Sequence, residues 1–182
     1  MKRVVLDDRE YTLREFTGDD SCDPHRFLSF IGTLIDDPAA MIKLKKKPSL
    51  EEEEKWLDAV YSAVSNSHEV MILAERDGSL VGIADMRLHP ERSDHVAEIA
   101  ISILGERNRG IGLGSALMME LIDAGLAGIR PSPMILRLSV FEKNERAKAL
   151  YGKLGFAEVA RIPGQFEFQG SLQDEVILLR DC

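Results

Sequence analysis

Residues 96–126 read VAEIAISILGERNRGIGLGSALMMELIDAGL, and the spacing of their apolar residues changes near the middle. Over residues 96–104 alternate side chains such as Ile99 and Ile101 share one face, which is typical of a strand. Over residues 115–126 the apolar residues recur at the three- and four-residue spacing of an amphipathic helix. This segment therefore predicts a strand, a glycine-rich loop and a helix, which is the arrangement found in α/β proteins.

The rest of the chain predicts further strands and helices around this unit. Ser49 and Glu52 form a capping box at the start of one helix. Because no repeat, low-complexity segment or linker interrupts the pattern, residues 1–182 predict one α/β (α+β) domain, with a mixed central sheet of about six or seven strands and about four helices. Helices are predicted at residues 24–35, 49–66 and 144–154, and strands at residues 4–16 (a hairpin), 70–75, 80–88, 134–140, 156–162 and 172–179.

The composition limits the classes of function. The chain has 182 residues, of which 45% are hydrophobic and 30% are charged, enough for a well-filled core. The formal net charge is -8. This charge argues against a nucleic-acid partner, because proteins that bind nucleic acids carry a basic face. A neutral or cationic partner suits the acidic balance better.

No targeting or membrane segment is expected. Residues 1–8 begin with basic side chains but reach acidic ones after three apolar residues, too few for the core of a signal peptide. No apolar run approaches the roughly 20 residues that a membrane helix needs, so we expect no membrane partner. Cys22 and Cys182 lie far apart and do not indicate a disulfide scaffold, which favours a reducing, cytoplasmic location.

The glycine-rich loop at residues 109–114, RGIGLG, joins the predicted strand to the predicted helix. Glycines let backbone amides turn toward a ligand, and a helix N-terminus adds partial positive charge, so the loop is suited to bind a phosphate or pyrophosphate. A turn that only connects two elements would have the same composition. The loop lacks the lysine of a P-loop, and its glycines are out of register with the dinucleotide-binding fingerprint.

This loop resembles the phosphate-binding loop of the GNAT superfamily of N-acetyltransferases, which reads Gln/Arg-x-x-Gly-x-Gly/Ala between a strand and a helix. A second register, starting at Arg107, fits as well, but the register from Arg109 places residues 115–118 where the family's helix begins. The resemblance implies that backbone amides of the loop bind the pyrophosphate of coenzyme A. The residues so assigned are Arg109, Gly110, Ile111, Gly112, Leu113 and Gly114.

A second stretch supports the same family. Residues 140–156 read VFEKNERAKALYGKLGF, which resembles the family's pattern of a strand followed by Asn-x-x-Ala-x-x-Leu-Tyr-x-x-x-Gly-Phe. Asn144 is a good helix N-cap and Gly155 is placed to end the helix, so an ordinary capped helix would explain this stretch alone. An ordinary helix does not explain why both motifs occur in the family's order, over residues 96–156.

The resemblance implies an enzyme that uses acetyl-CoA as cosubstrate and moves its acetyl group to a primary amine by direct attack in a ternary complex. Tyr151 takes the place of the tyrosine that protonates the sulfur of coenzyme A, with a packed aromatic side chain as the alternative. Glu98 corresponds to the glutamate that deprotonates the amine in some members. A structural salt bridge is an equally open interpretation of Glu98.

The resemblance also assigns the remaining cofactor contacts. Backbone amides of Ile101, Ser102 and Ile103 would bind the pantetheine arm where this strand splays from the next, and one of them could polarise the thioester carbonyl. Asn144 would reach the pantetheine or nearby cofactor atoms, although a simple N-cap looks identical in sequence.

Other chemistries are not indicated. The four histidines are scattered, with no spacing typical of a metal site, so we expect no metal. Neither Ser102 nor Ser139 lies in a Gly-x-Ser-x-Gly motif, so we expect no covalent acyl-enzyme.

The acceptor amine is not encoded in a motif. Residues 36–48 and 163–174 lie where the superfamily selects its acceptor, and they leave small amines, amino acids, polyamines, aminoglycosides, protein N-termini and lysine side chains open. The resemblance also leaves a homodimer open. The alternative function is a catalytically inactive module that binds coenzyme A for regulation.

Overall fold

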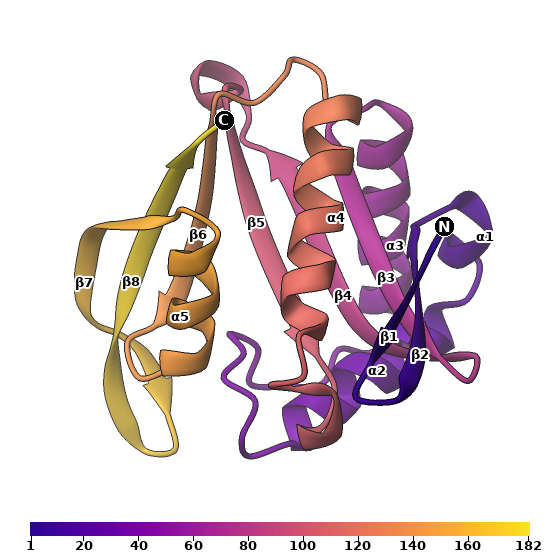
Figure 1. The fold of residues 1–182 in the computed structure, drawn as a ribbon, viewed down its shortest axis with the longest axis horizontal. Helices are drawn as coiled ribbons and strands as arrows, with labels where there is room; N and C mark the ends of the chain where they lie inside the picture. The colour runs from indigo at the N-terminus through magenta and orange to yellow at the C-terminus, as the bar shows by residue number, and fades with distance from the viewer.

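An eight-stranded sheet in the order β1-β2-β3-β4-β5-β6-β8-β7 runs through the molecule (Figure 1). The computed structural model describes residues 1–182. Neighbouring strands are antiparallel except for β5 and β6, which run parallel. The strands are β1 (Lys2–Leu6), β2 (Arg9–Glu15), β3 (Glu69–Arg76), β4 (Ser79–Leu88), β5 (Val96–Ile103), β6 (Ile135–Phe141), β7 (Ala157–Phe168) and β8 (Ser171–Asp181), and the helices are α1 (Gly18–Ser21), α2 (Pro24–Asp36), α3 (Leu50–Ser65), α4 (Leu113–Gly128) and α5 (Glu145–Lys153).

Side-chain caps fix the start of several helices. Asp23 caps α2 by accepting a hydrogen bond from the backbone of Arg26. The predicted capping box of α3 is confirmed, because Ser49 accepts from the amide of Glu52 and the Glu52 carboxylate accepts from the amide of Ser49. Each cap satisfies amides that the first helical turn leaves unpaired, so short polar residues decide where these helices begin.

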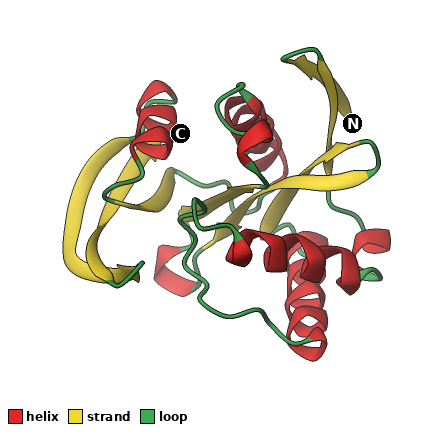
Figure 2. Cartoon of the chain, turned by 90° about the horizontal axis from the view of Figure 1, so that it is seen from below, coloured by secondary structure: helices red, strands yellow, loops and turns green.

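The sheet separates two hydrophobic cores (Figure 2). In one core Leu117 and Leu121 of α4 pack against strand residues such as Ile72. In the other core Phe27 of α2 and Leu57 of α3 pack under the opposite face of the same strands. Because α4 and α5 lie on one face and α2 and α3 on the other, the central strands are covered on both faces.

The predicted α/β class is confirmed, but there are eight strands and five helices instead of about six or seven strands and about four helices. The N-terminal hairpin adds two strands to the central sheet, because β2 pairs with β3. The helix α1 has only four residues, too short for a hydrophobic period. β7 continues past Ile162 to Phe168, because a register shift lets Pro163 and Gly164 lie outside the regular pairing.

The parallel strands β5 and β6 stay together for only a short distance. Their register pairs Val96 with Ile135 and Glu98 with Arg137, and no pair follows. β5 nevertheless remains paired with β4 as far as Ile103, and β6 remains paired with β8 to the end of that strand. The two halves of the sheet therefore diverge beyond Glu98, which leaves one edge of β5 without a neighbouring strand.

The close contact between α4 and β4 yields a test of this packing. A Cβ atom at Gly125 would lie 2.4 Å from the sulfur of the fully buried Met86. We expect Gly125→Ala to lower the free energy of unfolding by about 1–3 kcal/mol, as overpacking does, when measured by urea denaturation. Gly128→Ala is the control in the same helix, because its Cβ would meet only Val70 at 3.6 Å. Equal stability of the two variants would contradict the contact.

Candidate functional site

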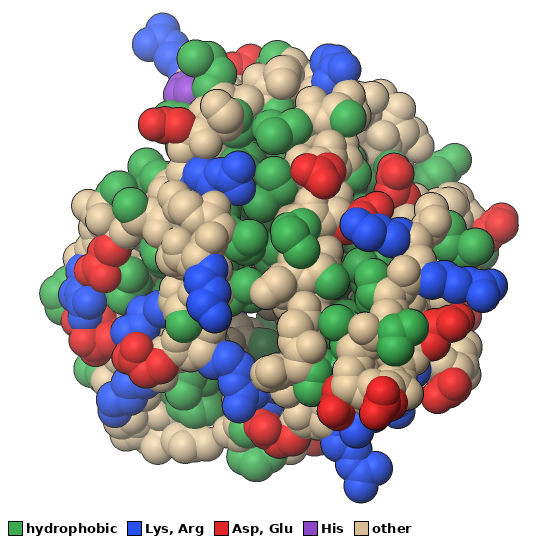
Figure 3. Space-filling model, in the orientation of Figure 1, with side chains coloured by type: hydrophobic (Ala, Val, Ile, Leu, Met, Phe, Trp, Pro, Cys, Tyr) green, Lys and Arg blue, Asp and Glu red, His purple; other side chains and the backbone are tan.

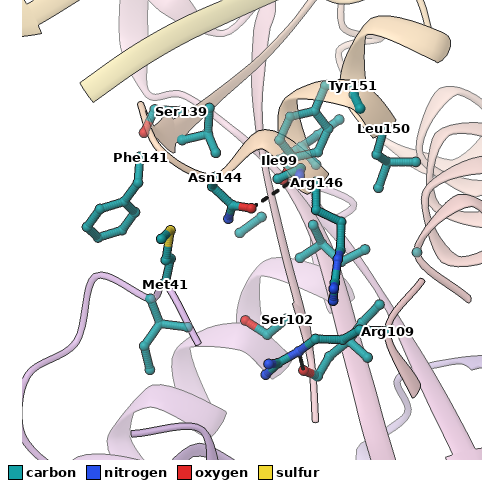
Figure 4. Close-up of a pocket in the computed structure, with 18 of the residues that line it drawn as sticks. Met41, Ile99, Ser102, Arg109, Ser139, Phe141, Asn144, Arg146, Leu150 and Tyr151 are labelled. Carbon is teal, nitrogen blue, oxygen red and sulfur yellow. Dashed lines mark hydrogen bonds between the residues drawn. The ribbon is translucent and has the colours of Figure 1, made fainter. Parts of the chain in front are cut away.

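A cavity of about 710 Å³ lies where β5 and β6 diverge. Both strands, the glycine loop, α5 and the segment after α2 line it (Figure 4). The space-filling view shows a hollow here, with Lys and Arg side chains along one edge (Figure 3). Ile111 and Leu113 are the predicted site residues that do not line the cavity, because their side chains pack into the core. The others do line it: Glu98, Ile101, Ser102, Ile103, Arg109, Gly110, Gly112, Gly114, Asn144 and Tyr151.

The backbone of β5 presents free polar groups to this cavity. Successive strand residues point their backbone N–H and C=O groups to opposite sides. The N–H of Leu104 donates to the carbonyl of Val81 on β4, at 2.9 Å. By alternation the amide of Ser102 also points to β4, whereas the amides of Ile101 and Ile103 point into the gap. The predicted amide contact from Ser102 therefore does not fit this geometry, although Ser102 lines the cavity.

The side chain of Arg109 ties the glycine loop to β5 and to the segment after α2. Its Nε donates to the carbonyl of Ile103 at 3.0 Å, and its Nη2 forms an ion pair with Asp37 at 2.8 Å. Its Nη1 is buried and has no hydrogen-bond partner, while Oε1 of Glu106 lies 3.6 Å away, too far for a hydrogen bond. Because an unpaired buried donor is costly, this guanidinium is suited to bind a ligand oxygen in the cavity.

The glycines of the loop are required for different structural reasons. Gly110 and Gly112 have φ angles of 79° and 97°, in the left-handed region that favours glycine. A Cβ at Gly110 would meet no atom within 4 Å, so the loop is open on this side. A Cβ at Gly114 would lie 3.2 Å from Cδ2 of Leu150, so this glycine allows α4 to pack closely against α5. Gly112 is the N-cap of α4, where unpaired helix amides favour an anion.

Tyr151 lines the cavity from α5. Its side chain is 7% exposed, and its ring packs edge-to-face against Phe156 with the centroids 6.2 Å apart. Burial raises the pKa of Tyr151 to about 12. The hydroxyl therefore keeps its proton at neutral pH, so Tyr151 is a packed aromatic side chain with a protonated hydroxyl on a residue that lines the cavity.

Asn144 is both the N-cap of α5 and a residue that lines the cavity. Its Oδ1 accepts from the amide of Ala147 at 3.2 Å, which makes it the N-cap of α5. The same side chain lines the cavity beside β6 (Figure 4). Its amide nitrogen is thus available to a ligand while its oxygen holds the helix start.

Glu98 lies where the two strands separate. Its Oε2 accepts from Nη1 of Arg137 on β6 at 2.9 Å and lies 3.2 Å from Nε2 of His89. This salt bridge joins β5 to β6 at their last paired residues. The structural salt bridge that the sequence left open is therefore present. The second carboxylate oxygen makes no hydrogen bond, and Glu98 also lines the cavity.

The segment between α2 and α3, residues 37–48, crosses the gap between the two halves of the sheet. Nζ of Lys43 donates to Oγ of Ser139 on β6 at 2.6 Å. Lys45 forms an ion pair with Glu167 of β7. The segment thus links the half of the sheet that contains β5 to the half that contains β6. Its residues that line the cavity are Met41, Ile42, Lys43 and Leu44.

A second cavity of about 320 Å³ adjoins the first, between α2, α3 and β4. The two cavities share Ile31, Leu44, Ile101 and Ser102. No local pattern in the sequence indicates the second cavity, because it depends on how two helices pack across a strand. Of the acceptor loops that the sequence indicated, only residues 36–48 reach it, through Leu44 and Pro48.

The carboxyl group of Asp85 faces this second cavity from β4. Burial raises the pKa of Asp85 to about 7, with further repulsion from Glu69 and Glu98 and an opposing effect of Arg87. A signal for this residue exists in the sequence, since Asp85 is the one charged residue in the otherwise apolar run at residues 80–86, LVGIADM. An isolated acid in a buried strand is a candidate functional group.

No group of three or more His, Cys, Asp or Glu side chains could hold a metal ion. None of the helices combines the length and the hydrophobicity needed to cross a membrane. The polar groups that face the two cavities are carboxyl, hydroxyl, amide, amino and guanidinium groups.

Comparison with known proteins gives matches in sequence and in structure. Residues 11–156 match the family model described as Acetyltransferase (GNAT) family. A mycothiol acetyltransferase from Thermomonospora curvata is 34% identical over 94 residues, which are 50% of this chain and 28% of that protein. A second mycothiol acetyltransferase, from Acidimicrobium ferrooxidans, is 32% identical over 106 residues, or 30% of its length. The chain thus spans less than a third of the length of these curated relatives.

Solved structures share the fold at low sequence identity. A GNAT family acetyltransferase from Streptococcus pneumoniae has a TM-score of 0.77 and 22% identity, covering 94% of this chain and 99% of that chain. A phosphinothricin acetyltransferase from Sinorhizobium meliloti, solved in complex with acetyl-CoA, has a TM-score of 0.74 and 19% identity, covering 94% and 88% of the two chains. At these identities the likeness concerns the fold.

The raised pKa of Asp85 predicts a pH-dependent contribution to stability. Between about pH 4 and pH 7 the unfolded chain ionises Asp85 while the folded protein keeps it protonated, so this group's contribution falls as pH rises, by about 1.4 kcal/mol per unit of pKa difference. Asp85→Asn removes the effect. We expect the stability gain of this variant over the parent, measured by urea denaturation, to grow from pH 4 to pH 7 and then level off. A gain that does not change with pH would show that Asp85 ionises normally.

Proposed function

The chain belongs to the acetyltransferase (GNAT) family, and from this premise we propose that it transfers the acetyl group of acetyl-CoA to a primary amine. Residues 1–182 form one N-acetyltransferase domain in this proposal. The amine attacks the thioester directly while both substrates are bound. The acceptor is a small molecule or a protein amine, and neither a nucleic acid nor a membrane takes part.

The observation that carries the proposal is the divergence of β5 from β6. It leaves the amides of Ile101 and Ile103 without a neighbouring strand on the wall of a large cavity. An extended ligand with its own amide groups, such as a pantetheine arm, can pair with such an edge as an added strand would. The unpaired Nη1 of Arg109 supplies a further donor beside Ile103.

The glycine loop supports a phosphate-binding role at one end of this edge. Gly110 is open on the side where a side chain would stand, and Gly112 begins α4, so backbone amides are accessible to an anion. Arg109 and Arg146 also line the cavity and add positive charge. Gly114 contributes through close helix packing instead, and Ile111 and Leu113 act only through their backbone.

Tyr151 is assigned the role of proton donor. Acetyl-CoA supplies an acyl group activated as a thioester, and transfer forms a C–N bond and breaks the C–S bond. The Tyr151 hydroxyl gives its proton to the departing sulfur and is then reprotonated from solvent. Its pKa of about 12 keeps the proton in place until the sulfur becomes anionic.

Glu98 is assigned the role of proton acceptor. Arg137 and His89 hold one oxygen of its carboxylate, which orients the group. The other oxygen makes no hydrogen bond with the protein, and in this proposal it receives the proton that the attacking amine loses, directly or through water. The backbone amide of Ile101 or Ile103 lies on the same wall and can stabilise the negative charge that develops on the carbonyl oxygen.

The experiment that tests the proposal measures free thiol released from acetyl-CoA in the presence of amines, amino acids, polyamines, aminoglycosides or peptides. Release that depends on one class of acceptor supports an acetyltransferase. Binding of acetyl-CoA in a thermal-shift assay, without release for any acceptor, would instead support the inactive coenzyme A binding module. Absence of acetyl-CoA binding would overturn both.

Replacement of Tyr151 tests the proton-donor role. We expect Tyr151→Phe to lower kcat by about 10²-fold or more while the affinity for acetyl-CoA stays unchanged, because only the hydroxyl is removed. Tyr61→Phe is the matched control, since Tyr61 is 46% exposed and lines neither cavity. A Tyr151→Phe enzyme with the kcat of the parent would refute the assignment. Calorimetry and thiol release give the two quantities.

Two variants at Gly110 separate phosphate binding from backbone strain. Gly110→Ala and Gly110→Glu carry the same cost of a positive φ, but only the glutamate places negative charge at the open side of the loop. We expect Gly110→Glu to weaken coenzyme A binding by about tenfold or more relative to Gly110→Ala, and to leave S-acetylpantetheine binding equal in the two variants. Equal affinity of both variants for coenzyme A would place the phosphates elsewhere.

A further inference from the structure

The second cavity has the composition of a site for an amine with an apolar body. Its wall is mainly apolar and includes the rings of Phe27, Phe30 and Trp56. Three acidic residues line it, Glu52 and Glu53 from α3 and Asp85 from β4. The Glu52 carboxylate is already bound to the amide of Ser49, so Glu53 and Asp85 are the two that remain for a ligand. Small-molecule sites combine a mostly apolar wall with a few polar groups in the same way.

Glu53 is buried without a partner. It is 5% exposed, and its carboxyl group makes no hydrogen bond or ion pair with any protein group. Its neighbours differ, because Glu51 pairs with Lys55 and the Glu52 carboxylate binds the amide of Ser49. Burial raises the pKa of Glu53, which reflects the cost of holding this charge away from water. A cation bound in the cavity would offset that cost.

Asp85 meets the same cavity without a cation of its own. The register places it between Met71 on β3 and Ala100 on β5. The nearby Arg87 is already bound to Glu69 at 2.6 Å. Two carboxyls from separate elements therefore face one space that no Lys or Arg side chain lines.

The position of the cavity connects it to the proposed reaction. Ile101 and Ser102 belong to the walls of both cavities, and Ala100, the strand partner of Asp85, lines the first. An amine held beside Asp85 is therefore next to the first cavity. The shared wall is the part of β5 whose free amides we assign to the cosubstrate. A molecule in the second cavity is thus placed to act as the acceptor.

We infer that the second cavity binds the acceptor, and that the acceptor is a small primary amine with an aromatic or aliphatic body and no carboxylate. This inference rests on the proposed acetyltransferase function. Glu53 and Asp85 attract the cationic amine, and the rings of Phe27 and Trp56, with centroids 6.0 Å apart, contact its apolar body.

The same features exclude other acceptors from this cavity. A free amino acid would bring its carboxylate against two unpartnered carboxyl groups, which is unfavourable in a site of low dielectric constant. A volume of about 320 Å³ lies at the lower end of the range for ligand sites, too small for an aminoglycoside or a peptide. Only the smaller amines from the range that the sequence left open remain.

Isothermal titration calorimetry with phenethylamine tests the inference on the protein alone and on the protein saturated with coenzyme A. Phenylalanine, which adds a carboxylate to the same body, is the comparison ligand. Glu53→Gln and Asp85→Asn each replace a carboxyl group, which can pair with an ammonium group as its carboxylate, and keep the shape of the side chain. Glu54→Gln is the matched control, because Glu54 is exposed on the next position of α3 and lines neither cavity.

We expect phenethylamine to bind with one-to-one stoichiometry and at least about tenfold more tightly than phenylalanine. Glu53→Gln and Asp85→Asn should each weaken it by about tenfold or more, and Glu54→Gln should not change it. Absence of phenethylamine binding, equal binding of phenylalanine, or equal affinity in all variants would each overturn the inference. Failure of the proposed acetyltransferase function would give a different result. Phenethylamine would still bind in a way that depends on Glu53, but no thiol would be released from acetyl-CoA.

Discussion

The candidate site depends on one feature of the sheet: the pairing between β5 and β6 stops before either strand ends. β5 and β6 share three paired positions and then separate, although each continues along its other neighbour. Buried backbone groups need hydrogen-bond partners, so an interrupted pairing within a sheet must be completed by something else. The carbonyl of Ile103 is completed by the side chain of Arg109, and Glu98 and Arg137 clamp the point of separation. The amides of Ile101 and Ile103 remain for a ligand.

Local signals in the sequence predicted most of the fold and part of the site. Ser49 and Asn144 begin their helices as expected, because a cap depends only on residues three positions away. α1 and the far half of β7 were outside the prediction, because four residues carry no period and Pro163 with Gly164 reads as a loop. Family motifs found the glycine loop and Tyr151. They missed Asp85 and Glu53, which line one cavity only in the folded protein. Alternation along β5 directs the amide of Ser102 toward β4 and away from the larger cavity.

The two cavities carry opposite charge, which suits two different substrates. Arg109, Arg146 and Lys153 line the larger cavity of a chain whose net charge is -8. Glu53 and Asp85 face the smaller one. The larger cavity would therefore attract an anionic cosubstrate and the smaller one a cationic acceptor. The two substrates would then lie on either side of the shared wall that contains Ile101 and Ser102.

Residue-level amide hydrogen exchange, with and without acetyl-CoA, tests the central claim most directly. Exchange rates report whether a backbone N–H is hydrogen-bonded or free. The account predicts that Ser102, which faces β4, exchanges slowly in both states, and that acetyl-CoA slows the exchange of Ile101 and Ile103. Unchanged exchange at Ile101 and Ile103 in the presence of bound acetyl-CoA would contradict the claim that this open edge of β5 holds the cosubstrate.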